Sequence, residues 1–66
     1  MDKFSEILKE LRLDRGLTQA MLALETGLSQ SAIAYWETGQ RGPSVLAVLT
    51  LARYFGVTTD YLLGEE

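Results

Sequence analysis

Apolar residues recur every three or four positions through much of this chain, which is the spacing of amphipathic helices. The first such segment carries Phe4, Ile7, Leu8 and Leu11. We expect this helix to end near Arg15, where Gly16 can supply the left-handed residue that closes many helices. No segment alternates apolar and polar residues as a half-buried strand does. The pattern therefore predicts an all-α chain.

Residues that favour helix starts and helix ends divide the rest of the chain. Four later segments are each preceded by a hydroxyl side chain that can accept a hydrogen bond from the first helical turn: Thr18, Ser29, Ser44 and Thr58. The second and third helices are predicted from Gln19 to about Thr26 and from Gln30 to about Glu37, ended by Gly27 and Gly39. The fourth is carried by Val45, Val48, Leu49, Ala52 and Phe55 and closed by Gly56, and a short fifth runs through Leu63. Five short helices with brief connections predict one compact domain over residues 1–66.

The second and third predicted helices are joined by a very short connection, Thr26-Gly27-Leu28-Ser29. A short turn containing glycine between two helices is the helix-turn-helix arrangement. Ala23 and Gly27 are small enough to let the two helices approach. Leu28 can fill the angle between them, with Ile33 and Trp36 behind it.

Composition limits the functions that the chain can have. With no Cys and no His, a structural zinc site or a disulfide is not expected. No glycine-rich phosphate loop or catalytic constellation is visible, so we expect no enzyme, no cofactor, no metal and no small-molecule substrate. The longest apolar run, Val45 to Leu49, is too short to span a membrane, no signal peptide is visible, and the absence of Cys suits the cytoplasm. The formal charge of −3 argues mildly against a nucleic-acid partner.

The segment "LTQAMLALETGLSQSAIAYWETGQRGPS" resembles the phage Cro/repressor type of helix-turn-helix, a family that includes xenobiotic-response-type bacterial regulators. The resemblance extends from the first helix to "FGVTTDYLLG", nearly the whole chain. It implies a compact five-helix, lambda-repressor-like domain with its motif at about residues 18–38. The implied function is that of a sequence-specific transcriptional regulator, a repressor that binds an inverted-repeat operator in double-stranded DNA as a homodimer. The sequence fits either a complete protein or the N-terminal domain of a longer repressor.

In this family the third helix reads the major groove, so its outward positions are the implied base contacts. On a helical wheel these are Ser31, Ala34, Tyr35 and Thr38, with Gln30 in the exposed first turn. Gln30 suits adenine, and Ser31 suits most bases. Tyr35 can offer its ring to a thymine methyl group or its hydroxyl to a phosphate, and Ala34 offers apolar contact alone. The alternative is that Gln30 and Ser31 are merely solvated residues at a helix start.

Other implied DNA contacts lie at helix starts and in the turn after the third helix. Thr18 and Ser29 are caps that we also place at the DNA surface. The resemblance implies that Gln19 touches the sugar-phosphate backbone and braces Gln30. Backbone N–H groups at helix starts can hold phosphates without side-chain charge. Arg15 and Arg41 are the expected phosphate cations, and with both a dimer would show a slope of log K against log[salt] of about −4.

Acidic residues near the motif require their own explanation. The family pattern pairs Glu37 with Arg12, which lies at the edge of the first helix's apolar stripe. Four acids of that helix are spaced four residues apart and are expected to point away from DNA: Asp2, Glu6, Glu10 and Asp14.

Several apolar residues leave a rival interpretation open. Met21 and Leu24 stand where the family commonly has polar residues; we expect them to pack within the chain, and otherwise to form a contact patch with Leu46 similarly exposed. A dimer seam is expected from Tyr54, Tyr61 and Leu63. The alternative function is a protein-interaction module, such as an antitoxin with weak DNA binding.

Overall fold

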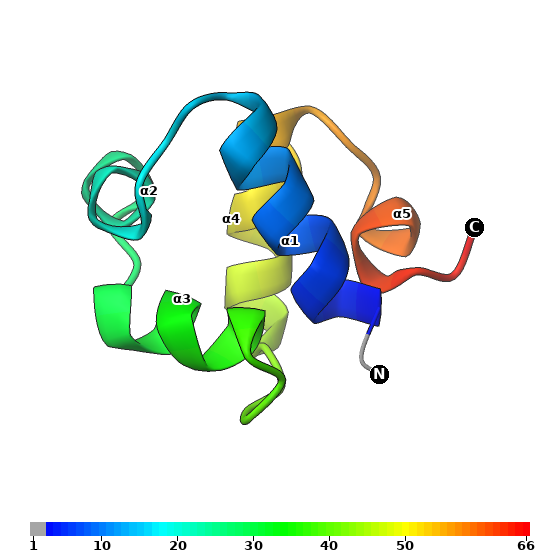
Figure 1. The fold of residues 1–66 in the computed structure, drawn as a ribbon. Coiled ribbons are helices and arrows are strands. Elements are labelled where there is room, and N and C mark those ends of the chain that lie inside the picture. The colour runs from blue at the N-terminus through cyan, green and yellow to red at the C-terminus, as the bar shows by residue number, and fades with distance from the viewer. Residues whose placement is uncertain (1–2) are drawn as a thin grey trace.

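The computed structural model describes residues 3–66, which form five helices and no strand. They are α1 (Lys3–Asp14), α2 (Gln19–Thr26), α3 (Gln30–Glu37), α4 (Val45–Phe55) and α5 (Thr59–Leu63). Figure 1 shows α4 crossing the centre of the molecule behind α1, with α2 and α3 on one side and α5 on the other. The predicted all-α, five-helix architecture is confirmed.

Each of the four predicted hydroxyl caps is formed. The side-chain oxygens of Thr18, Ser29, Ser44 and Thr58 accept hydrogen bonds from backbone N–H groups three residues on, at 2.9 to 3.2 Å. At the other ends, Gly27 and Gly56 take the left-handed conformation, with φ of 75° and 70°. The first helix ends at Asp14, one residue before the predicted end. Local signals therefore determine where the helices begin and end.

The core is built from side chains of all five helices. Its fully buried members of greatest volume are Leu8, Leu22, Ile33, Leu51 and Leu62. Phe4 of α1 meets Trp36 of α3 edge to face, with ring centres 6.3 Å apart, a favourable geometry for an aromatic pair. This contact holds α3 against the start of α1.

The predicted helix-turn-helix is formed by α2, α3 and the turn between them. Leu28 packs against the core from within the turn. The Thr26 hydroxyl donates to the carbonyl oxygen of Leu22 at 2.7 Å and accepts from the N–H of Leu28 at 3.3 Å. Because Thr26 makes hydrogen bonds on both sides of the turn and Leu28 fills the space between the helices, the angle between α2 and α3 is fixed.

Candidate nucleic-acid interface

The third helix has one buried face and one exposed face, as the helical wheel predicted. Ile33 and Trp36 are 0% and 5% exposed. The side chains on the opposite face are accessible to solvent: Gln30, Ser31, Tyr35 and Thr38 are exposed and Ala34 is half-buried. The residues expected to read DNA therefore share a surface and have no role in the core.

An ion pair fixes the end of α3 against α1. Nε of Arg12 donates to Oε2 of Glu37 at 2.7 Å, and its second terminal nitrogen donates to Oε1 at 2.8 Å. The remaining nitrogen donates to the carbonyl oxygen of Leu17 at 2.7 Å. The hydrogen bonds that Arg12 donates to Glu37 raise the pKa of Arg12 despite the opposing effect of burial. The predicted pairing is thus present, and Glu37 is structural in this arrangement.

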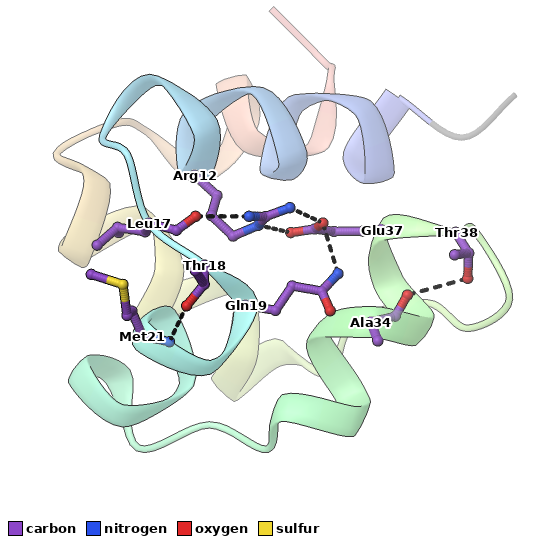
Figure 2. A network of polar contacts seen from close by, with 8 residues as sticks. All are labelled: Arg12, Leu17, Thr18, Gln19, Met21, Ala34, Glu37 and Thr38. Atoms are coloured by element: carbon purple, nitrogen blue, oxygen red, sulfur yellow. Dashed lines mark hydrogen bonds and ion pairs between the residues drawn. The ribbon is translucent and has the colours of Figure 1, made fainter.

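The carboxylate of Glu37 also accepts a hydrogen bond from α2. Figure 2 shows it between the guanidinium of Arg12 and the carboxamide of Gln19, whose Nε2 donates to Oε1 at 3.0 Å. The expected bracing of Gln30 by Gln19 is not formed within residues 3–66, because the amide of Gln19 turns to this buried acceptor. One polar network therefore joins the two helices of the motif, α2 and α3, to α1.

Two of the predicted DNA contacts, Thr18 and Ser29, already serve as caps. Thr18 Oγ1 accepts from the N–H of Met21 at 3.0 Å, and Ser29 Oγ accepts from the N–H of Ala32 at 3.2 Å. Other N–H groups of each first turn have no partner within their own helix, as at any helix start. Both side chains are exposed, so capping and contact with a ligand are compatible.

The two arginines expected to bind phosphate lie in different surroundings. Arg41 lies beside α3, with its guanidinium carbon 4.8 Å from the centre of the Tyr35 ring. Arg15 instead donates to the carbonyl oxygens of Tyr54 and Phe55, at 3.4 and 3.0 Å. It thereby caps the C-terminus of α4, the end remote from the α3–α4 turn. The expected contact of Arg15 with a DNA phosphate stays a prediction, and in the free chain its guanidinium is engaged where the ends of α1 and α4 meet.

The acids of α1 do not all point away from α3. Glu6 and Glu10 line a shallow hollow together with Glu37 and Thr38 of the α3 end. Lys9 lines the same hollow, so the two carboxylates lie beside a cation where α1 packs against α3. That the acids of α1 point away from DNA stays a prediction. Asp14 is exposed at the far end of α1, and Asp2 lies outside the described residues.

An apolar face on α4 and α5 was only partly expected. Val45, Leu46, Leu49 and Leu63 are 77%, 71%, 38% and 37% exposed. A groove of about 430 Å³ lies among Pro43, Val45, Val48, Leu49, Thr59 and Leu63. Val45 and Leu49 belong to the apolar pattern that predicted α4, yet both side chains are exposed, because the apolar stripe of α4 is wider than the face that the core covers.

The other apolar predictions have mixed outcomes. Tyr54 is not part of this face, since its hydroxyl donates to Oε1 of Glu25 on α2 at 2.5 Å. Met21 and Leu24 are 44% and 85% exposed. The expectation that they pack within the chain is wrong, most clearly for Leu24, because α2 turns only one side towards the core.

No helix in the described part of the chain is long and apolar enough to cross a membrane. Among residues 3–66, no group of His, Cys, Asp or Glu side chains is arranged to hold a metal ion.

Known proteins share both this sequence pattern and this arrangement. The helix-turn-helix family model matches residues 8–62. The transcriptional activator BcrR of Enterococcus faecalis is 40% identical over 65 residues, covering 97% of this chain and 32% of that protein. The restriction-modification controller protein C.AhdI from Aeromonas hydrophila is 38% identical, with a TM-score of 0.81 over 91% of both chains. The P22 c2 repressor, solved with a synthetic operator, is 27% identical, with a TM-score of 0.89 over 100% of both chains.

The chain belongs to the helix-turn-helix family of the Cro/repressor type. This is a family of DNA-binding transcriptional regulators. The chain spans 32%, 54% and 46% of the length of three curated relatives, which are therefore longer proteins.

Proposed function

We propose that this chain is a DNA-binding domain, over residues 1–66, that represses transcription by binding an inverted-repeat operator as a homodimer. The observation that carries the proposal is the division of α3 into an anchored face and a free polar face. Ile33, Trp36 and Glu37 hold one side, so Gln30 and Ser31 are presented on a rigid helix. Such a helix fits the major groove of B-DNA.

Residues of the exposed surface of α3 and of the neighbouring helix starts have chemical roles in this proposal. Gln30 offers a bidentate carboxamide to adenine, and Ser31 offers a hydroxyl to a neighbouring base. Ala34 gives apolar contact. Thr18, Gln19 and Ser29, at the starts of α2 and α3, lie where backbone N–H groups can hold phosphates. Arg41 adds a cation at the other end of α3.

Homodimer formation is supported by the exposed apolar face of α4 and α5. One short helix reads only a few base pairs, whereas two copies would read half-sites about 10 base pairs apart, centre to centre. We expect Leu49→Glu to convert the dimer to a monomer, because it places a charge in the apolar seam. Leu24→Glu, with the same change of charge on α2, is the matched control. Analytical ultracentrifugation of both variants measures whether each is a monomer or a dimer.

The operator is tested by selecting bound sites from random duplexes and footprinting the result. We expect two protected half-sites in inverted orientation, and loss of protection on both when one is scrambled. Protection of a single half-site that persists when the other half-site is scrambled would contradict dimeric binding. Repression is tested with a reporter whose promoter overlaps the selected site, since relatives include an activator as well as a repressor.

A second function is favoured by one observation, the exposure of Leu24 and Met21 on α2. Apolar patches of this kind mark protein contacts, so the rival is an interaction module, such as an antitoxin, with weak DNA binding. Failure to bind any specific duplex at low salt would favour this rival.

An operator-binding regulator acts where the chromosome lies, so we also propose a cytoplasmic location.

A further inference from the structure

An arginine and a tyrosine six positions apart meet beyond the end of α3. Gly39, at φ 77°, reverses the chain, and the N–H of Gln40 donates to the carbonyl oxygen of Tyr35 at 3.0 Å. This closure brings the guanidinium of Arg41 over the Tyr35 ring, 4.8 Å from its centre. Residues six apart on a continuous helix would be turned to different sides, so the glycine turn is what makes the contact.

Arg41 differs from the other two arginines around the motif. Arg12 is paired with Glu37, and Arg15 donates to the end of α4. Within residues 3–66, Arg41 has neither an ion pair nor a hydrogen bond. Its five N–H donors are therefore free for an acceptor outside the protein. A planar fork of such donors matches two oxygens of a phosphate, or O6 and N7 of a guanine.

We propose that Tyr35 is a positioning residue, which holds Arg41 at the end of α3 so that its guanidinium binds a backbone phosphate of DNA. This inference rests on the proposed DNA-binding function. The Tyr35 ring already carries Arg41 in the free protein, so a thymine methyl group would have to displace the cation. A guanidinium that is already ordered loses less side-chain entropy when it binds.

The phosphate is favoured over guanine by the position of the pair. Arg41 follows the C-terminus of α3, whereas Gln30 and Ser31 begin the helix at its other end. Recognition helices of this type contact base edges mainly through their N-terminal residues. The pair would thus contribute affinity for any sequence and fix the register of α3 on the duplex.

A double-mutant cycle in the full chain tests this role. The variants are Tyr35→Leu, which removes the ring, Tyr35→Phe, which keeps it, Arg41→Ala, and Tyr35→Leu combined with Arg41→Ala. Each is titrated against a selected duplex and a scrambled duplex. We expect Tyr35→Leu to weaken binding to both duplexes equally, by about threefold per protomer, the range of an exposed cation–π contact. Tyr35→Phe should bind as the unmodified chain does, and Tyr35→Leu should have no further effect once Arg41 is Ala.

A measurement without DNA tests the contact between Arg41 and the Tyr35 ring independently of the proposed DNA binding. Proton NMR of the Arg41 side chain should show upfield shifts from the ring in the unmodified chain and in Tyr35→Phe, and none in Tyr35→Leu. Arg53→Ala, which removes one charge from the last turn of α4, is the charge-matched control and should leave both the shifts and the binding unchanged.

Different failures have different meanings. Additive losses in the cycle would overturn the positioning role. A loss confined to one A·T pair would make Tyr35 a base reader, and a loss confined to one G·C pair would make guanine the acceptor; both overturn the proposal. If the unmodified chain bound neither duplex at low salt, the proposed function itself would fail, together with the phosphate assignment, while the NMR shifts would still establish whether the ring orders Arg41.

Discussion

The side chains of Arg12 and Glu37 are almost excluded from solvent, with 9% and 3% of their surfaces exposed. Removing one partner of such a pair leaves an uncompensated buried charge, which typically costs about 3–5 kcal/mol. We expect Glu37→Gln and Arg12→Met each to lower the melting temperature severely, because a domain of this size has little stability to lose. The loss of stability in the combined variant should be smaller than the sum of the losses in the two single variants. Thermal melts followed by Trp36 fluorescence measure this, and strictly additive losses would remove the pairing.

A second residue-scale prediction concerns Tyr54. Its hydrogen bond to Glu25 raises its pKa above the ordinary value of 10.0, and Arg15 opposes the rise through its charge. A pKa raised in the folded state means that the stabilisation is complete below the unfolded pKa and is lost as pH rises through the folded pKa. We expect Glu25→Ala to lower the Tyr54 midpoint, measured by phenolate absorbance as the difference from a Tyr54→Phe variant. Glu10→Ala should leave it in place, and an unchanged midpoint in Glu25→Ala would contradict the assignment.

Residue partners across the fold were predictable only where a family pattern supplied them. Arg12 and Glu37 were found that way. The contacts of Gln19 with Glu37 and of Arg15 with the end of α4 were not predicted, because the choice among several acceptors depends on how helix ends meet in space. The Arg41–Tyr35 contact had no signal in helical periodicity, since a left-handed turn at Gly39 lies between the two residues.

At the scale of the helices, the turn between α2 and α3 gives a direct test of backbone conformation. A Cβ added to Gly27 would meet no atom within 4 Å, so its left-handed φ of 75° is the only obstacle to a side chain. We expect Gly27→Ala to cost about 1–2 kcal/mol and Gly27→Asn to cost less, since Asn tolerates this region better. Gly42→Ala, also in open space but without a positive φ, is the matched control. Equal stabilities of Gly27→Ala and Gly42→Ala in urea unfolding would show that the turn is not constrained.

Helix starts and ends were predicted almost to the residue, because capping hydroxyls and left-handed glycines act over three or four residues and need no tertiary context. Which side of a helix is buried was harder to predict. On α4 the residues Val45 and Leu49 have the same apolar periodicity as the core residues Val48 and Ala52, yet they are exposed. Apolar spacing alone does not distinguish a core face from a face that another molecule covers.

For the molecule as a whole, the question is how a chain with a formal charge of −3 would hold DNA. Glu6 and Glu10 lie beside the end of α3, and the only arginine beside the exposed face of that helix, within the described residues, is Arg41. Lys9 lines the same hollow as Glu6 and Glu10 and offsets part of their charge. Most of the binding is therefore left to geometry: fixed helix starts, neutral side chains and two copies of α3. Affinity should therefore depend weakly on salt.

The salt prediction changes once Arg15 is assigned to the end of α4. With Arg41 as the cation of each protomer, a dimer neutralises about two phosphates, and log K against log[salt] should have a slope near −2 rather than −4, at about −0.9 per phosphate. Arg41→Ala should bring the slope close to zero while leaving the preference between duplexes unchanged. Gln30→Ala should do the reverse: it should lower the preference at one base position by about 1–3 kcal/mol and leave the slope unchanged.

The measurement is a titration of specific and scrambled duplexes across a salt series, with Arg53→Ala as control. A slope near −10, as for strongly basic repressors, would mean that other cations contact the backbone, and a slope near −4 that depends on Arg15 would return that arginine to the DNA surface.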